Sequence, residues 1–545
     1  MAKITTPQRF WKLLDSYKKQ IQEIYLLAFF IGIISLSFPV GIQAIINFIQ
    51  IGELTTSWLI LVALVVLGIA ASGILQVLQM RIVENIQQDI FAKSAIDFGF
   101  RFARIKNLTN QNLNLPELSN RFFDVLTIQK GLPKILIDFS ISIFQIIFGI
   151  ILLSIYSSYF MLFGVILIFV MWLIFRITGP KGLETSVKES SSKYDLAYWL
   201  EGIAKNATTF QLFWESELHL EKTDQKLGEF LKHRESHFHV LINQFRYFIA
   251  FRSILAASFL ILGGFLIFSE KMNIGQFVSS EIIVVLLLAS VEKIVRASET
   301  IYDVLTALYK IGYVADLPLE DYPDPNKNKL EIDRFKFENR IEISAQNLIL
   351  EEKDTTVFNF NLKQGEKKVV SGLCDHKKNR MLSALIGLHK PFGGQIEYND
   401  IGWDSLDNGH LQKHMGIFVR RSEIFQGSIL ENITVGRKYD PSQLQTLVEK
   451  MQLEKYLNKL PLGLDTVIED LNENLPEHVI GKIKLVRALL GKPKILLLEE
   501  PLLYLLEPEK SAIAKELKSF DGTLLVFSED PLWTESNDVE PLTIN

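Results

Sequence analysis

The stretch Val369–Leu388 (VVSGLCDHKKNRMLSALIGL) decides how the carboxyl-terminal part of the chain folds. It begins with apolar residues typical of a strand, turns at Gly372, and ends in a segment with the apolar spacing of a helix. A strand, a tight turn and a helix in this order form the layout of a phosphate loop, whose pattern is G-x-x-x-x-G-K-[ST]. The stretch therefore predicts an α/β domain with the frame of a nucleotide site at this turn.

Two positions of this pattern carry other residue types. Gly372 takes the first glycine and Lys378 the lysine, but Lys377 stands at the second glycine and Asn379 at the hydroxyl residue. The second glycine lets successive backbone N–H groups curl around phosphate oxygens, and a long side chain obstructs that approach. An amide cannot replace the hydroxyl that holds Mg²⁺ without changing the coordination geometry. We therefore expect the frame of the site to be present and its phosphate contacts to be damaged.

The composition points to a membrane protein of two or more domains. Of the 545 residues, 48% are hydrophobic, and many of these lie in long runs. The single cysteine, Cys374, excludes an internal disulfide framework and fits a reducing compartment. The formal net charge is −5, and neither half of the chain is basic enough to suggest nucleic acid as the partner. No metal, haem or flavin motif stands out.

Apolar runs long enough to cross a bilayer precede the α/β domain. Residues 1–23 are basic and amphipathic, and we expect them to form a cytosolic helix along the membrane rather than a signal peptide. Six runs in one chain make buried helices of a soluble protein an improbable explanation. The runs are about Ile24–Ile49, Trp58–Met80, Ile135–Tyr156, Tyr159–Ile177, Phe248–Phe268 and Phe277–Val295.

The links between the runs predict the topology. Short links follow the first, third and fifth runs, whereas long links rich in Lys and Arg follow the second and fourth. Positive charge on one side places the long links, the amino terminus and everything after the sixth run in the cytosol. Isoleucines four residues apart at Ile82, Ile86 and Ile90 indicate helices that continue below the bilayer. Within the long links, Leu115–Phe123 and Trp199–Asn206 are either short cross-helices or ordinary helix breaks.

Segments after the phosphate loop follow in the order of a known family. We place a linker at 319–340, because its Pro- and Asn-rich sequence separates the apolar half from the α/β domain at 341–545. Met415–Ile433 is similar to the segment that carries the Q-loop of ATP-binding cassettes, and Val486–Pro501 is similar to the segment running into their Walker B strand. The chain resembles an ABC exporter half-transporter over nearly its whole length. The resemblance implies a six-helix transmembrane domain with long cytosolic extensions at 24–318, followed by an α/β P-loop NTPase-like cassette.

Tracts such as Gly179–Ser190 and Met272–Ile282 are similar to the subgroup that exports peptides, bacteriocins and toxins from bacteria. This resemblance implies a multi-pass protein of the bacterial inner membrane, with the cassette in the cytosol. Partners would be the lipid bilayer, a second copy or another ABC half-transporter, and an envelope or periplasmic adaptor. Because residues 1–23 leave no room for a peptidase domain before the first run, we do not expect leader cleavage.

Carried over position by position, the resemblance implies altered residues at most working positions of the cassette. The Q-loop glutamine falls on Arg420 and the switch histidine falls on Glu529. In the Walker B motif, Glu499 replaces the metal-bound Asp, and Glu500 matches the general base. The five positions of the signature motif LSGGQ are Leu475, Pro476, Glu477, His478 and Val479. In this motif, Pro476 has no N–H to donate, and Glu477 brings a negative charge towards the opposite subunit's phosphate.

These departures suggest a transporter component whose cassette is a pseudo-ATPase. Phosphoryl transfer depends on positioning and charge neutralisation, so the loss of several of these groups leaves little catalysis. ATP and Mg²⁺ would then be ligands only if residual binding survives, and Glu500 would be catalytic only in an active cassette. Two alternatives stay open: an ATP-driven exporter of peptides, toxins or other amphipathic substrates, and a membrane scaffold or regulator of an envelope complex.

Overall fold

The computed structural model describes residues 5–51, 56–106, 115–319, 341–351, 356–403, 406, 408–420, 422–468 and 475–542. The chain divides into two compact units, and each is described by itself. One unit comprises Met1–Ile105 and Asn114–Pro318, and the other comprises Lys106–Leu113 and Leu319–Asn545. The expected linker at 319–340 lies outside the described residues apart from Leu319.

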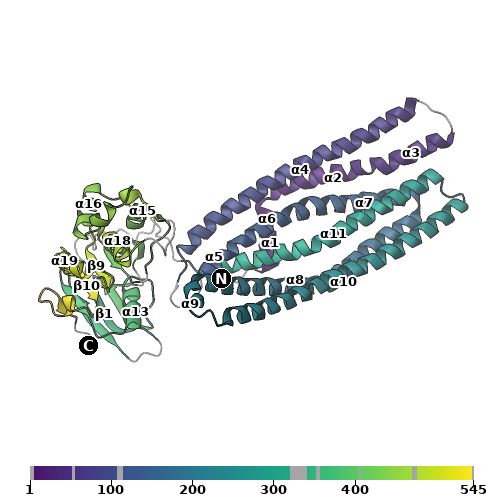
Figure 1. The fold of residues 1–545 in the computed structure, drawn as a ribbon. Coiled ribbons are helices and arrows are strands. Elements are labelled where there is room, and N and C mark those ends of the chain that lie inside the picture. The colour runs from purple at the N-terminus through teal and green to yellow at the C-terminus, as the bar shows by residue number, and fades with distance from the viewer. Residues whose placement is uncertain are drawn as a thin grey trace. The chain divides into compact units, whose positions relative to one another are not determined.

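The first unit is a bundle of long helices (Figure 1). Its described residues contain six segments long and apolar enough to cross a membrane, as the sequence predicted. Helices suit this environment because they satisfy every backbone polar group internally. The elements are α1 (Thr6–Ser16), α2 (Lys18–Ser35), α3 (Ser37–Ile51), α4 (Thr56–Phe102), α5 (Leu115–Asn120), η1 (Arg121–Phe123), α6 (Asp124–Pro133), the π-helical turn η2 (Lys134–Asp138), α7 (Phe139–Tyr156), α8 (Ser158–Lys205), α9 (Ala207–Leu212), α10 (Leu218–Phe268) and α11 (Ile274–Ala315).

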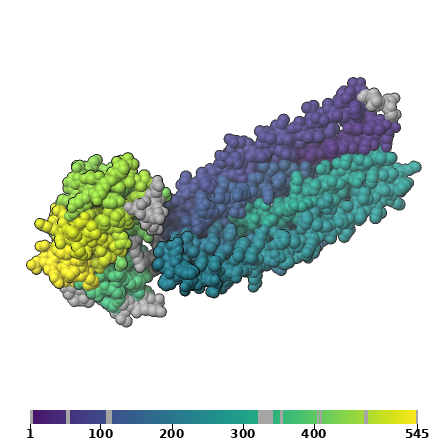
Figure 2. Space-filling model, viewed as in Figure 1, coloured from purple at the N-terminus to yellow at the C-terminus, as the bar shows by residue number. Residues whose placement is uncertain are grey.

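The helices extend well past the length that crosses a bilayer. α4, α8 and α10 have 47, 48 and 51 residues, whereas about 20 residues suffice for one crossing. The prediction that the helices continue beyond the bilayer agrees with these lengths, while the side on which they extend stays a prediction. α8 packs along α10, and α11 packs against both α3 and α7, so the purple and teal helices lie side by side in Figure 2. Close packing needs small residues, and a Cβ at Gly182 would lie 2.5 Å from the Tyr302 ring.

One of the two expected cross-helices is displaced. α5 and η1 span Leu115–Phe123, where the first was expected. The second was wrong as placed, because α8 continues through Trp199–Lys205 and the short helix α9 begins only at Ala207. Asn206 ends α8, with both its backbone N–H and its side-chain amide donating to the Gly202 carbonyl. Gly202 lies inside α8, where a glycine in a long helix is tolerated at modest cost.

The second unit is an α/β domain with its main sheet parallel throughout, in the order β11-β3-β10-β9-β6. A second sheet, β2-β1-β4-β5, is antiparallel, and β7 pairs with β8. The strands are β1 (Ile343–Ile349), β2 (Phe358–Leu362), β3 (Lys367–Val370), β4 (Gly393–Tyr398), β5 (Ile401–Gly402), β6 (Met415–Phe418), β7 (Gly427–Ser428), β8 (Val467–Ile468), β9 (Ile495–Glu499), β10 (Thr523–Phe527) and β11 (Glu540–Pro541). The helices are α13 (Asp375–Leu385), α14 (Asn408–Lys413), α15 (Ile429–Thr434), α16 (Pro441–Lys450), α17 (Glu454–Leu457), η4 (Gly463–Asp465), α18 (Glu477–Leu489), α19 (Glu507–Lys518) and α20 (Pro531–Thr534).

The central strands of the parallel sheet position the site. β9 (ILLLE) and β10 (TLLVF) are buried along their whole length, because helices cover both faces of a parallel sheet. Their continuous apolar sequence fits this environment. Because the carboxyl ends of parallel strands meet at one edge, the residues that follow β3, β6, β9 and β10 gather there.

Candidate nucleotide-binding site

The edge formed by the carboxyl ends of β3, β6, β9 and β10 brings together the predicted residues of the phosphate loop, Q-loop, Walker B and switch. Gly372 follows β3, Arg420 follows β6, and Glu529 follows β10. Glu499 ends β9 and Glu500 comes directly after it. Hydrogen bonds connect residues from all four strand ends, so the linear order of motifs does correspond to one site.

The phosphate loop is short and leads directly into a helix. Gly372 has a φ of +78°, a conformation that glycine adopts without strain. α13 begins at Asp375, and the Lys378 N–H donates to the Cys374 carbonyl at 3.0 Å. Asp375, His376 and Lys377 are therefore already helical, although the G-x-x-x-x-G-K-[ST] pattern lies between strand and helix. The Lys377 ammonium donates to the Thr356 hydroxyl at 2.8 Å, and Asn379 lies half-buried on α13.

Lys378 is held by two carboxylates of the same chain. Its side chain is 2% exposed, and Nζ lies 2.9 Å from both Glu500 Oε1 and Glu529 Oε1. Burial by itself lowers the pKa of Lys378, but hydrogen bonds and attraction from the two glutamates outweigh it, so the pKa is raised. The Gly372 N–H also donates to Glu529 Oε1, at 2.9 Å. Glu529 thus engages the loop glycine and the loop lysine, the two groups of the pattern that approach phosphate oxygens.

The other acidic residues at this edge are also engaged. Glu500 Oε2 accepts from the Ser528 hydroxyl at 2.6 Å, and Glu499 Oε2 accepts from the Arg420 N–H at 3.0 Å. The Arg420 side chain turns towards α13, where Nη1 lies 2.8 Å from Asp375 Oδ2. The edge is therefore a network of internal ion pairs and hydrogen bonds.

The side chains as arranged do not fit a Mg²⁺-bound triphosphate. Mg²⁺ needs a near-octahedral set of oxygens and usually takes one or two carboxylates plus phosphate oxygens. Both Glu500 oxygens and one Glu499 oxygen already accept hydrogen bonds, and an amide stands at Asn379 in place of the hydroxyl. A terminal phosphate would also have to displace Glu529 from Lys378.

The signature positions lie on a separate segment, at the start of α18. Leu475 precedes the helix, Pro476 is its N-cap, and Glu477 is exposed in its first turn. His478 is half-buried, while Val479 is fully buried in the core. In the part of the chain that the structure describes, Lys378 pairs with Glu500 and Glu529 and with none of these five residues.

Sequence reasoning missed a buried lysine behind the Q-loop position. Lys484 of α18 is 5% exposed, and its Nζ donates to the Arg420 carbonyl at 2.9 Å and lies 4.9 Å from the centre of the Phe418 ring. Burial and then the charge of Arg487 lower the pKa of Lys484 to about 8. The sequence signal that could have identified Lys484 is its position on the apolar face of the helix EHVIGKIKLVRAL.

The resemblance to ABC cassettes implies an aromatic ring for adenine near Leu350–Lys353, where the sequence LEEK contains none. Glu351 pairs with His376 and, at 3.0 Å, with Arg380. The hydrogen bond from His376, opposed in part by burial, lowers the pKa of Glu351. The rest of the expected segment, 352–353, lies outside the described residues.

Comparison with protein-family models gives two matches in sequence order. Residues 22–291 match the ABC transporter transmembrane region, and residues 355–503 match the ABC transporter domain. A cassette of this family implies ATP and Mg²⁺ as its ligands. The match covers the phosphate-loop, Q-loop, signature and Walker B positions and stops before Glu529.

Similar curated proteins are bacterial transport proteins. One is the lactococcin-A transport/processing ATP-binding protein LcnC of Lactococcus lactis, 24% identical over 50% of this chain and 38% of that protein. Another is the type I secretion system ATP-binding protein PrsD of Rhizobium meliloti, 25% identical over 53% of this chain and 50% of that protein. The chain spans half or less of the length of these relatives.

A solved structure resembles the fold over nearly the whole chain. It is described as a bacterial Atm1-family ABC exporter with ATP bound. Its TM-score is 0.79 at 15% sequence identity, covering 94% of this chain and 91% of that one. At this identity the likeness concerns the fold alone.

Proposed function

Because this chain has the architecture of an ABC exporter half-transporter, with a transmembrane domain first and an ABC cassette second, we propose that it is one subunit of a membrane exporter. Its cargo would be a peptide, a toxin or another amphipathic molecule. The observation that carries this proposal is the six-span helical unit preceding a cassette, together with the curated relatives that transport lactococcins and serve type I secretion. These findings support the export alternative of the sequence analysis better than its main prediction.

A cassette that does not hydrolyse ATP is a second candidate, favoured by one specific contact. Glu529 lies on Lys378 and on the Gly372 N–H, so a carboxylate takes the place that a phosphate would need. Positioning and charge neutralisation dominate phosphoryl transfer, and here the loop lysine is already neutralised. The pseudo-ATPase prediction rests on this geometry and on the substituted residues, since the family matches say nothing of catalysis.

The assembly and location follow as parts of the proposal. A half-transporter needs a second half, which would be another copy or a partner with an intact cassette. The long helices α4, α8 and α10 would extend into the cytosol, because the positive charge of the links favours that side. We place the subunit in the bacterial inner membrane with its cassette in the cytosol. A scaffold or envelope regulator stays a prediction without an observation that favours it.

The first test asks whether this chain itself hydrolyses ATP. The full chain is purified in lipid nanodiscs, and its ATPase rate is compared with that of Glu500→Gln. Equal rates support the pseudo-ATPase candidate, whereas robust turnover that Glu500→Gln abolishes contradicts it and leaves the exporter proposal standing.

Blue-native electrophoresis with mass spectrometry then identifies the second half. Recovery of a homodimer or of a complex with another ABC half-transporter supports the exporter proposal. Recovery only with envelope proteins that are not transporters, together with no loss of cargo export in cells lacking the chain, contradicts it.

A further inference from the structure

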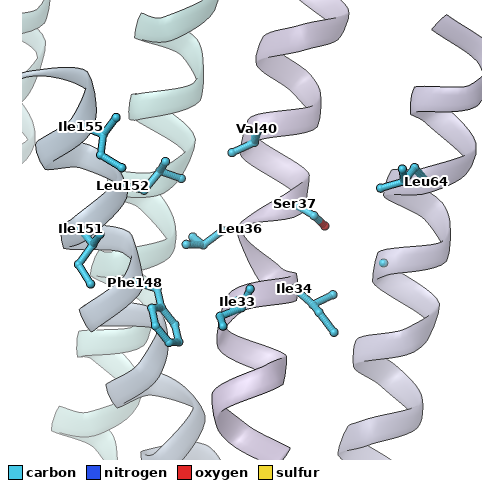
Figure 3. A pocket seen from close by; sticks show the side chains of 11 residues that line it. Ile33, Ile34, Leu36, Ser37, Val40, Leu64, Phe148, Ile151, Leu152 and Ile155 are labelled. Carbon is cyan, nitrogen blue, oxygen red and sulfur yellow. The ribbon is translucent and has the colours of Figure 1, made fainter. Parts of the chain in front are cut away.

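A cavity of about 580 Å³, open along one side, lies between the first three predicted spans (Figure 3). Its lining residues Leu64, Ile151 and Ile155 are each more than half exposed, so the cavity is a groove on the surface of the helices. α2 and α3 provide its central wall, and Figure 3 shows their side chains between those of α4 and α7. Leu64 and Gly68 of α4 close one side, and Phe148, Ile151 and Ile155 of α7 close the other. This cavity is remote in sequence from every residue of the cassette and plays no part in the nucleotide site.

The cavity is built into the fold by a helix break and a glycine. α2 ends at Ser35 and α3 starts at Ser37, because Pro39 has no N–H to donate to the Ser35 carbonyl. Gly68 lies opposite the break and contributes no side chain. A Cβ at Gly68 would approach Ser37 Oγ to 2.9 Å, so a larger residue there would intrude on this wall.

The wall chemistry excludes water and peptide as stable contents. All side chains around the cavity are apolar except Ser37, whose Oγ is buried and has no hydrogen-bond partner among the described residues. An ordered water needs two to four polar partners, and one hydroxyl does not supply them. A peptide would bury backbone amides without partners, which is costly. The contents are therefore apolar.

The position of the cavity identifies the apolar molecule available to it. Leu36 and Ser37 lie near the middle of the first apolar run, and Gly68 lies near the middle of the second. At this depth the surrounding solvent is the hydrocarbon of the bilayer. The volume falls within the range of ordinary ligand pockets, about 300–1,000 Å³. We propose that this cavity binds one acyl chain of a membrane lipid, held between α2–α3, α4 and α7.

The test labels the occupant directly in the full chain. The protein is reconstituted in phosphatidylcholine nanodiscs that contain phosphatidylcholine with a diazirine in the middle of one acyl chain. After irradiation, adducts are mapped by peptide mass spectrometry. We expect adducts to concentrate at Val40 and Ile151 and to exceed those at Ile60, which is 63% exposed on α4.

Filling the cavity should remove these adducts. Leu64→Trp places a large ring in the wall, and Ile151→Trp does so independently from α7. Leu67→Trp is the matched control, because Leu67 lies on α4 outside the cavity and is 69% exposed. Loss of the cavity adducts in both filling variants but not in the control supports the proposal. The proposal is overturned if the cavity wall and Ile60 carry equal amounts of adduct, or if the filling variants carry as many wall adducts as the control. It is also overturned if the wall carries no adduct because a second copy or cargo covers it.

Discussion

The strands of the cassette and the residues that follow them obey different constraints. Leu497, Leu498 and Val526 are fully buried, and each is an apolar residue that a covered parallel sheet requires. Directly after these strands, Glu500 and Glu529 turn back onto Lys378. The comparison teaches that packing preserves the fold while the edge of the sheet is free to change its chemistry. The predictions below test how separate the two regions are.

The largest effect is expected inside a central strand. Leu498→Asp buries an unpaired carboxylate in β9, and the cost should exceed about 4 kcal/mol. The cassette should then lose protection in hydrogen–deuterium exchange of the full chain. Leu503→Asp, at a residue that is 45% exposed just beyond the strand, is the matched control and should leave protection unchanged. An equal loss of protection in both variants would mean that the strand and the sheet edge do not differ in their tolerance of substitution.

Lys378 should matter for stability even without nucleotide. Lys378→Met leaves Glu500 and Glu529 without their cation, and we expect the cassette to lose about 3 kcal/mol of unfolding free energy. Thermal unfolding of the full chain in nanodiscs measures this. Lys377→Met removes a neighbouring lysine that donates to Thr356 and should cost much less. A stable Lys378→Met protein would show that the ion pairs do not hold the edge together.

Lys484 should make stability rise with pH. The pKa of Lys484 is about 8 in the folded chain, against an ordinary 10.5. Between these values the unfolded chain holds a proton that the folded chain has released, so unfolding takes up a proton and stability increases with pH. The increase should be of the order of 3 kcal/mol across this window, because each pKa unit corresponds to about 1.4 kcal/mol.

Lys484→Met should remove this increase, and Lys459→Met, at an exposed lysine, should retain it. Denaturation of the full chain is followed at several pH values from 7 to 11. An unchanged pH dependence in Lys484→Met would show that Lys484 keeps an ordinary pKa.

The smallest effect is expected at Arg420. Its guanidinium is 39% exposed and pairs with the exposed Asp375, so Arg420→Gln should change stability by no more than about 1 kcal/mol. The backbone N–H that serves Glu499 is retained in this variant. Thermal unfolding checks the result. A loss as large as that of Lys378→Met would show that the Arg420–Asp375 pair contributes as much to stability as the ion pairs of Lys378.

The sequence predicted what depends on local pattern. Six apolar runs predicted the six spans, and the resemblance to ABC cassettes named Gly372, Arg420, Glu499, Glu500 and Glu529, which the structure places at one edge of the sheet. It did not predict the break at Leu36, since a Pro inside a helix kinks it only by an amount that packing decides. It also did not predict the contact of Glu529 with Lys378, because a pairing between distant segments depends on tertiary positions that no local pattern encodes.

The central claim is that a carboxylate of the chain itself occupies the phosphate loop. Equilibrium binding of ATP with Mg²⁺ to the full chain in nanodiscs tests it, with Glu529→Gln as the variant and the exposed Glu535→Gln as the control. We predict no saturable binding by the natural chain or the control and a gain of binding in Glu529→Gln. Tight binding by the natural chain that Glu529→Gln leaves unchanged or weakens would contradict the claim.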